Sequence, residues 1–303
     1  MYRIALRAVV AGWLSLGFCG WTSAEPASSG SATQIGPWCV IESANFRVAG
    51  ITSQQQIKAL LDTCEATRSK LTAQWLGAGT GAWEPKCYIV LHPTADSYLR
   101  EVGEGQMTAG SSLIELAGDR LVTRRVDLRA DHPEGYLGAL AHELTHVVIA
   151  ERFIERQIPR WADEGMAVLA DSKSKQDLHH GDLGLARSNR TTFRLIELMQ
   201  LEKYPEPERQ GTFYGQSASL VRFLVAHGGE QKFVGFLKKS SQIGYDAALR
   251  DIYKFSGVAE LEQHWKRHLE TAAVQPSVAG TPVVVSQVTM PAAQAAPELV
   301  QSR

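Results

Sequence analysis

Two histidines and a glutamate stand within five consecutive residues, His142-Glu143-Leu144-Thr145-His146. The surrounding segment, residues 134–153, is apolar and long enough for about five turns of helix. On a helix, His142 and His146 project from one face, so an imidazole nitrogen of each can reach a single Zn²⁺ at about 2.0–2.1 Å. Glu143 points about 100° away around the helix, where it is placed to hold a water on the metal rather than to bind the metal itself.

A pattern of this length arises by chance in roughly one or two chains per hundred, so its surroundings decide the interpretation. Apolar residues form a stripe along the same helix: Leu137, Leu140, Leu144, Val147 and Val148. Asp131, Pro133 and Glu134 together are typical of a helix start. The pattern therefore predicts a half-buried helix that carries a metal site.

A second helix is predicted to open at Pro159 and to carry Glu164, 18 positions after His146. Taken alone, Glu164 reads as a solvated helix charge. A loop that folds this helix back on the first one would bring the Glu164 carboxylate to the metal, and Gly165 would let the two helices approach closely. Two histidines, one glutamate and a water form a catalytic zinc set, whereas a structural site closes all four positions.

The HELTH motif followed by PRWADEGMA resembles the gluzincin metallopeptidases, the thermolysin-like and aminopeptidase-like members of the peptidase MA clan, in their bacterial exported form. The resemblance runs from about residue 38 to 269. It implies His142, His146 and Glu164 as zinc ligands and Glu143 as general base. It also implies an α+β, thermolysin-like zincin fold with an N-terminal mixed sheet lobe and a mainly helical C-terminal lobe.

The spacing departs from the family at one point, because the 17 residues between His146 and Glu164 are one fewer than the usual aminopeptidase spacing. A loop deletion accounts for the difference. Asp163 is the alternative third ligand, although its shorter side chain lies on the neighbouring helix face. Asp163 can instead orient a ligand histidine from outside the metal's own ligand set.

The resemblance also implies a hydroxyl donor for the oxyanion. In the related aminopeptidases a tyrosine at the start of a comparable helix has this role, and Tyr214 matches its position. The alternative is a tyrosine that serves packing alone. His179 and His180 fall in the polar stretch 171–189, which is predicted as a loop at the rim of the site. One of them can contact substrate, or both can be ordinary exposed histidines.

The N-terminus has the pattern of an export signal. Two arginines precede an apolar core at residues 8–18, and small residues at 22–24 form a cleavage site. We expect residues 1–24 to be removed and the mature protein to be periplasmic or secreted. Lipoprotein anchoring at Cys19 is less favoured, because the residue before it is bulky.

Composition divides the rest of the chain. Residues 25–36 are predicted to be a flexible lead-in and residues 271–303 a disordered tail. Between them, we expect residues 37–270 to form one gluzincin-like metallopeptidase domain, with a sheet lobe over about 37–130 and the zinc helices and helical lobe over about 131–270. The net charge is −1 and the sequence contains no basic run, so nucleic-acid binding is not expected. The mature chain has no apolar run long enough for a membrane span.

The sheet lobe is predicted from its hydrophobic periodicity. We expect a strand at Cys39–Ala49, a helix at Gln54–Leu76, a strand at Lys86–His92 and a hairpin of Ser111–Leu116 with Leu121–Leu128. By analogy with gluzincins, the hairpin edge at Gly110–Leu113 would pair with an extended substrate, although an ordinary sheet edge is an equal alternative.

The helical lobe is predicted from apolar residues at i, i+3 and i+4. The expected helices cover Phe193–Leu201, the region 213–224, Phe233–Leu237, Tyr245–Tyr253 and Val258–Leu269.

Three cysteines remain after removal of the export signal. An exported protein favours a disulfide, and Cys64 on the apolar face of its helix would pack on the strand of Cys87. Cys64–Cys87 is therefore the predicted pair, Cys39–Cys87 is the second choice, and buried free thiols are the alternative.

Together these features predict zinc-dependent hydrolysis of a bond in a peptide or protein substrate, with Zn²⁺ as cofactor. Two other classes remain open: a catalytically silent relative that binds peptides at the cell envelope, and a structural module in which zinc locks two helices. No acidic anchor for a free N-terminus precedes the zinc helix, where Glu115 is the one carboxylate of the first hairpin strand. Endopeptidase activity is therefore slightly favoured over aminopeptidase activity.

Overall fold

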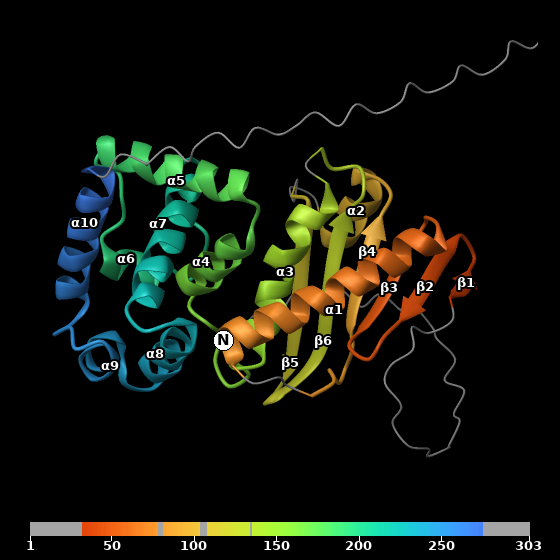
Figure 1. The fold of residues 1–303 in the computed structure, drawn as a ribbon, viewed down its shortest axis with the longest axis horizontal. Coiled ribbons are helices and arrows are strands. Elements are labelled where there is room, and N and C mark those ends of the chain that lie inside the picture. The colour runs from red at the N-terminus through yellow and green to blue at the C-terminus, as the bar shows by residue number, and fades with distance from the viewer. Residues whose placement is uncertain (1–31, 78–80, 104–107, 134, 275–303) are drawn as a thin grey trace, which may run out of the picture.

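The computed structural model describes residues 32–77, 81–103, 108–133 and 135–274 (Figure 1). The predicted export signal with Cys19, most of the lead-in, Glu134 and the tail from residue 275 lie outside the described residues. Within them the chain is α+β, with an N-terminal mixed sheet followed by a mainly helical region, as the sequence predicted.

Within the described residues, six strands form one sheet in the order β1-β2-β3-β4-β6-β5. Their bounds are Thr33–Ile35 for β1, Trp38–Glu42 for β2, Phe46–Gly50 for β3, Cys87–His92 for β4, Gly110–Ala117 for β5 and Arg120–Arg129 for β6. The pairs β3–β4 and β4–β6 are parallel, and the other pairs are antiparallel. The predicted strand at 86–92 and the predicted hairpin are confirmed, and β5 is an edge strand.

The sheet differs from the prediction at its N-terminal end. The single strand expected at Cys39–Ala49 is two antiparallel strands, β2 and β3, joined by a turn in which Ser43 N donates to Phe46 O at 2.9 Å. Polar side chains make this turn, since Ser43 and Asn45 both bind the Glu65 carboxylate. Strand β1 also lies inside the segment expected to be a flexible lead-in, because it pairs with β2.

Helices cover both faces of the sheet. Helix α1 has the predicted bounds, Gln54–Leu76, begins at the capping residue Ser53, and packs on one face beside α3, Tyr136–Ala150 (Figure 1). Helix α2, Ala95–Val102, packs on the opposite face, where Tyr98 meets His92 edge-on at 5.8 Å between ring centroids.

The helical lobe follows α3 in the chain. It consists of α4 (Arg160–Ala170), α5 (Lys173–Ser188), α6 (Leu195–Gln200), α7 (Pro207–Ala226), α8 (Glu230–Ile243), α9 (Tyr245–Ile252) and α10 (Val258–Val274). Large aromatic side chains fill its core, among them the fully buried Trp161, Phe213, Phe233, Phe236 and Trp265. None of the helices in the described ranges has the length and apolarity needed to cross a membrane.

The prediction of a polar loop at 171–189 is wrong, because most of this stretch is helix α5. The Ser172 hydroxyl caps the helix by accepting from Lys175 N, and the narrow buried face of Leu183 and Ala186 was too small to stand out among polar residues. Helix α5 approaches α7 closely, since a Cβ on Gly215 would lie 2.2 Å from the His179 carbonyl oxygen.

Candidate metal centre

Helix α3 presents the two histidines between the sheet and the helical lobe (Figure 1). Its apolar side packs against the sheet and α1, and the predicted stripe is buried except at Leu137, which is 54% exposed in the first turn. The helix starts after Gly135 (φ +74°) without a side-chain cap. Asp131 does not cap it as predicted, since its carboxylate instead accepts from Ala95 N at 2.8 Å and Arg129 Nε at 3.1 Å.

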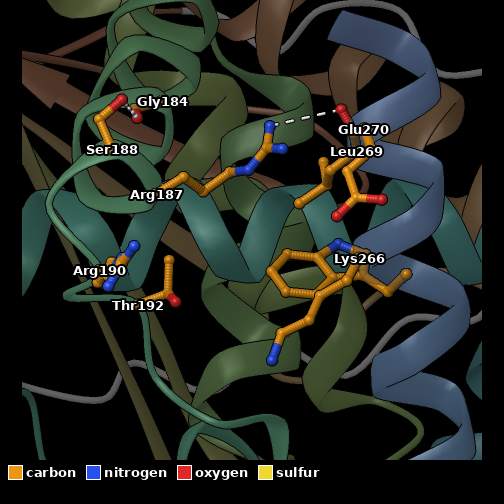
Figure 2. A pocket seen from close by; sticks show the side chains of 9 residues that line it. Gly184, Arg187, Ser188, Arg190, Thr192, Lys266, Leu269 and Glu270 are labelled. Carbon is orange, nitrogen blue, oxygen red and sulfur yellow. Dashed lines mark hydrogen bonds between the residues drawn. The ribbon is translucent and has the colours of Figure 1, made fainter.

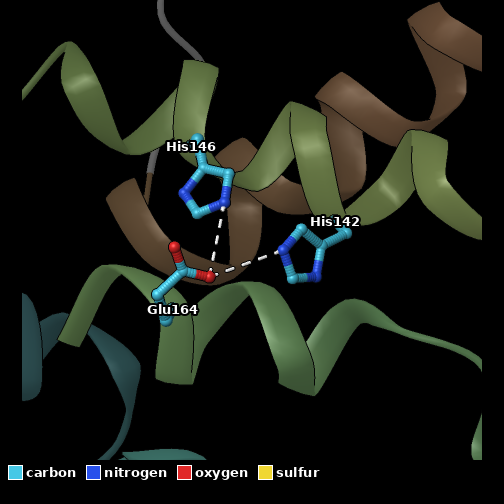
Figure 3. A group of neighbouring side chains, drawn as sticks. All are labelled: His142, His146 and Glu164. Carbon is cyan, nitrogen blue, oxygen red and sulfur yellow. Dashed lines mark ion pairs between the residues drawn. The ribbon is translucent and has the colours of Figure 1, made fainter. Parts of the chain in front are cut away.

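Helix α4 brings the third candidate ligand to the histidines (Figure 3). Glu164 Oε2 lies 3.6 Å from His142 Nε2 and 3.9 Å from His146 Nε2, and one ligand atom from each of the three residues falls within 4.8 Å of the others. Their side chains are only 5–11% exposed. A tetrahedral ion with bonds of about 2.0–2.2 Å separates its ligand atoms by roughly 3.3–3.6 Å. The two distances from Glu164 Oε2 to the histidines lie within a few tenths of an ångström of this range, so the cluster is compatible with Zn²⁺.

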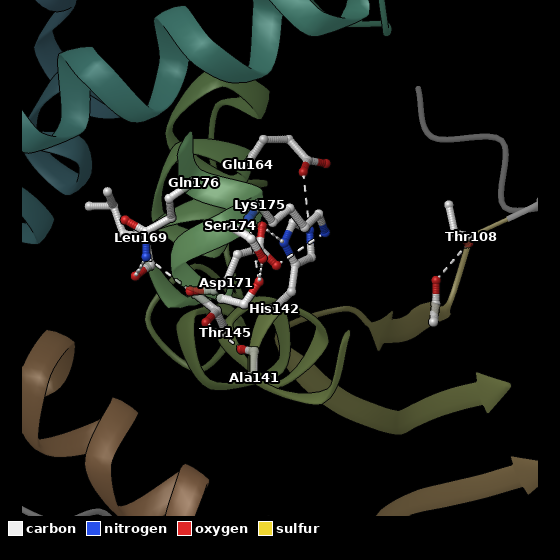
Figure 4. A network of polar contacts seen from close by, with 12 residues as sticks. Thr108, Ala141, His142, Thr145, Glu164, Leu169, Asp171, Ser174, Lys175 and Gln176 are labelled. Carbon is white, nitrogen blue, oxygen red and sulfur yellow. Dashed lines mark hydrogen bonds and ion pairs between the residues drawn. The ribbon is translucent and has the colours of Figure 1, made fainter. Parts of the chain in front are cut away.

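Each histidine uses its other ring nitrogen to bind an aspartate. His146 Nδ1 lies 2.8 Å from Asp163 Oδ1, and His142 Nδ1 lies 3.1 Å from Asp171 Oδ2. Figure 4 shows the contact between His142 and Asp171. Lys175 Nζ donates to the same aspartate, to Oδ1 at 3.1 Å. These carboxylates fix the ring orientations and leave both Nε2 atoms for a metal. Asp163 therefore occupies the orienting position anticipated for it and not that of a third ligand.

Asp171 was not anticipated from the sequence. It is the C-terminal cap of α4, and its contact with His142 depends on how α4 lies against α3. Its side chain is fully buried, which was the one property that could have singled it out. A buried aspartate at the end of a helix cannot be recognised from residue type alone.

The carboxylates control the charge of the cluster. Burial opposes protonation of His146, but the neighbouring Asp163, Glu164 and Glu143 outweigh burial and raise the pKa of His146. The pKa of His142 is raised in the same way, against burial, by its contacts with Asp171 and Glu164. Burial would raise the pKa of Glu164, yet the two histidines lower it well below its usual range. The carboxylates therefore favour the protonated form of both histidines, and the histidines favour the ionised form of Glu164.

Glu143 lies beside the edge strand of the sheet. A Cβ on Gly110, the first residue of β5, would lie 3.0 Å from Glu143 Cγ, so a larger residue there would press on the Glu143 side chain. The predicted edge at Gly110–Leu113 thus runs next to the predicted general base. Pairing of a substrate with this edge remains a prediction.

Two tyrosines approach the cluster from the helical lobe. The Tyr204 hydroxyl, from the loop between α6 and α7, donates to Glu164 Oε1. The Tyr214 ring on α7 lies 6.4 Å from the Tyr204 ring. Burial raises the pKa of Tyr214, and the negative charges of Glu164 and Glu143 raise it further. Tyr214 was predicted from the sequence, whereas Tyr204 has no local pattern that distinguishes it.

The remaining sequence predictions fall outside the cluster. His179 on α5 lies against the Tyr214 ring at 5.3 Å, while His180 is exposed. Gly165 allows close contact with α7 rather than with α3, because its Cβ would meet Val221 Cγ2 at 2.6 Å.

The cysteines differ from the favoured prediction. Cys39, Cys64 and Cys87 are free and buried, so neither predicted pairing is present in the structure. Burial raises the pKa of the Cys64 and Cys87 thiols, which keeps them neutral.

A pocket of about 560 Å³ lies between α5 and α10, away from the cluster (Figure 2). Its lining includes Arg187, Arg190 and Lys266. Arg187 already donates to the Leu269 carbonyl at 3.4 Å, and Lys266 pairs with Glu262 at 2.6 Å. The cluster on α3 and α4, and not this pocket, is therefore the candidate functional site.

The cluster of His142, His146 and Glu164 in this α+β fold is consistent with a zinc site of the HExxH…E type. A scan against known protein families matches residues 128–271 to the Peptidase MA superfamily, and this part of the chain is a Peptidase MA superfamily domain. The match extends from the end of β6 to α10 and contains all three candidate ligands. A search of the curated proteins found no match.

Proposed function

We propose that this protein is a zinc metallopeptidase that hydrolyses peptide bonds with Glu143 as general base. The observation that carries the proposal is the cluster of His142, His146 and Glu164 inside a Peptidase MA superfamily domain. Within the described ranges this cluster contains three side-chain ligands, and a catalytic zinc keeps its fourth position for water or substrate.

A bound Zn²⁺ would supply Lewis-acid activation of a water molecule and of the substrate carbonyl. The Glu143 carboxylate takes a proton from the attacking water as the new carbon–oxygen bond forms. The same carboxyl then gives this proton to the leaving amine as the carbon–nitrogen bond breaks. The Tyr214 hydroxyl donates a hydrogen bond to the carbonyl oxygen, where negative charge develops.

The substrate is proposed to be a peptide or protein. The position of the β5 edge beside Glu143 supports an extended chain that pairs with Gly110–Leu113. Endopeptidase cleavage is favoured because the sequence offers no acidic anchor for a free N-terminus. The predicted export signal would place this activity in the periplasm or outside the cell.

Metal content and peptide cleavage test the proposal together. We expect about one zinc per chain in the wild type and little in His146→Ala, because the variant keeps only two of the three ligands. Glu143→Gln should keep the zinc and lose about 10²-fold or more of the cleavage rate, because it cannot accept the proton.

Three results would overturn the proposal. Wild-type protein that binds no zinc after reconstitution removes the metal site. Zinc-loaded protein that cleaves no member of a broad peptide library removes the peptidase and favours a binding relative. A Glu143→Gln variant that is as active as the wild type removes Glu143 as the general base.

A further inference from the structure

We propose that Tyr204 is a positioning residue for the metal ligand Glu164, and that it restricts this carboxylate to one metal-binding oxygen. The inference rests on the metal site of the proposed function and adds a residue that the HExxH…E pattern does not contain. It starts from the two oxygens of Glu164, which have different partners.

One oxygen of Glu164 faces the histidines and the other faces Tyr204. Oε2 lies 3.6 Å from His142 Nε2 and 3.9 Å from His146 Nε2, whereas Oε1 accepts the Tyr204 hydroxyl. A carboxylate held in this way offers a single atom to the metal. Coordination through both oxygens would occupy the space that a tetrahedral catalytic ion keeps for water.

The Tyr204 ring is held in place from the same helix that carries Glu164. The Arg160 guanidinium lies 4.2 Å from the Tyr204 ring centroid, and Arg160 Nε donates to the Glu202 carbonyl at 3.2 Å. Because Arg160 and Glu164 are four residues apart on α4, they project from one face of the helix. One face of α4 thus binds both the ring and the hydroxyl of Tyr204.

The helical lobe supports the ring from a further direction. Phe213 meets the Tyr204 ring edge-on, at 6.1 Å and 89°. Tyr204 is 46% exposed as a whole, so its position depends on these contacts rather than on deep burial. The Arg160 and Phe213 contacts therefore hold the Tyr204 ring in the orientation that directs its hydroxyl to Glu164.

This role differs from that of an oxyanion donor. A tyrosine has a single O–H, and in Tyr204 this group is directed to Glu164 Oε1. It cannot donate to a substrate carbonyl at the same time. Loss of the hydroxyl should therefore act on metal binding first, whereas loss of the Tyr214 hydroxyl should act on turnover.

Zinc affinity, measured by competition with a chromophoric chelator, tests this assignment without any peptide substrate. We expect Tyr204→Phe to raise the zinc dissociation constant about 10–100-fold, the usual effect of removing a contact to a metal ligand. Tyr88→Phe is the matched control, because Tyr88 is equally exposed, at 45%, and lies on β4 away from the cluster. Its zinc affinity should equal that of the wild type.

The visible spectrum of the Co²⁺-substituted protein gives a readout that a purely structural role would not change. In Tyr204→Phe, Glu164 is free to bind through both oxygens, so we expect weaker absorption bands, typical of a higher coordination number. Arg160→Ala keeps the hydroxyl but removes the contact to the ring, and should weaken zinc binding in the same direction by a smaller factor. Circular dichroism of the metal-free proteins establishes that each variant is folded.

Unchanged zinc affinity and an unchanged Co²⁺ spectrum in Tyr204→Phe would overturn the inference. So would a fall in turnover with unchanged zinc affinity, which would make Tyr204 a donor to the substrate. If Tyr204→Phe does not fold, wild-type zinc affinity in Arg160→Ala overturns it. A zinc-binding wild type that cleaves no peptide would end the proposed function but leave the Tyr204 assignment standing, whereas a wild type without zinc ends both.

Discussion

At the scale of single residues, the site is organised by which nitrogen each histidine offers. Asp163 and Asp171 engage the two Nδ1 atoms, so both Nε2 atoms face Glu164. The two histidines could be predicted because an i, i+4 pair on a helix needs no tertiary information. Glu164 lies on a second helix, and its prediction rested on an assumed return of that helix to the first and on the family resemblance. Asp171 could not be predicted, since its contact with His142 exists only once α4 is packed against α3.

The role of Tyr214 gives a prediction at this scale. Tyr214→Phe should lower kcat by about 10²–10³-fold, because a donor to the developing oxyanion is lost while the metal ligands are untouched. Steady-state kinetics and zinc content measure the two effects separately. Turnover within about threefold of the wild type would show that Tyr214 serves packing, as its contacts with Phe213 and His179 also permit.

At the scale of elements, periodicity predicted most of the structure. The bounds of α1 and the position of the β5–β6 hairpin follow from apolar spacing and a short turn. Among the features that were missed, two have clear physical reasons. Helix α5 buries too few apolar residues to be recognised, and the β2–β3 turn depends on Glu65 of α1, which is distant in sequence.

The contact between α4 and α7 gives a prediction about stability. Gly165→Ala should destabilise the protein by about 1–3 kcal/mol, since the new Cβ would meet Val221 Cγ2 at 2.6 Å and Ser217 O at 2.7 Å. Gly138→Ala on α3 is the control, because its Cβ meets no atom within 4 Å and should stabilise the helix by up to about 1 kcal/mol. Urea unfolding of the metal-free proteins measures both, and equal effects would refute a close helix contact.

The pairing of β4 with β6 includes a buried charge cluster that predicts a dependence on pH. Asp127 accepts from His92 Nε2 at 2.7 Å and from Arg125 Nε at 2.8 Å. Burial would raise the pKa of Asp127, but these two partners outweigh burial and lower it. Because the folded pKa lies below the unfolded value, the stabilisation is present above about pH 4 and is lost as the pH falls through the folded pKa.

Asp127→Asn should therefore be less stable than the wild type by about 3 kcal/mol at pH 7, with a smaller difference at pH 3. Urea unfolding at both pH values, with chelator present so that metal does not contribute, measures this. Asp62→Asn is the control, since Asp62 is exposed and its pair with Lys58 contributes at most about 1 kcal/mol. A difference for Asp127→Asn that does not change between pH 7 and pH 3 would contradict the assigned pKa direction.

At the scale of the whole molecule, the candidate metal site joins the two lobes. Helix α3 packs on α1, β5 and β6, whereas α4 packs on α7 (Figure 1). The cluster joins α3, which carries the two histidines, to α4, which carries Glu164. The sequence predicted the order of a sheet lobe and a helical lobe. It could not predict their junction, because the contact of α1 with α8 pairs residues far apart in the chain.

A zinc ion at this junction should stabilise the folded protein as a unit. Ligand present at about 100 times its dissociation constant contributes about 2.7 kcal/mol, which for a domain of this size raises Tm by roughly 5–10 °C. We therefore expect a chelator to lower Tm by this amount and added zinc to restore it, as measured by differential scanning calorimetry. The Tm of His146→Ala should be the same with and without chelator. A wild-type Tm that does not respond to chelator would mean that the ion does not connect α3 to α4, since any ion bound only to the folded state must shift the unfolding equilibrium.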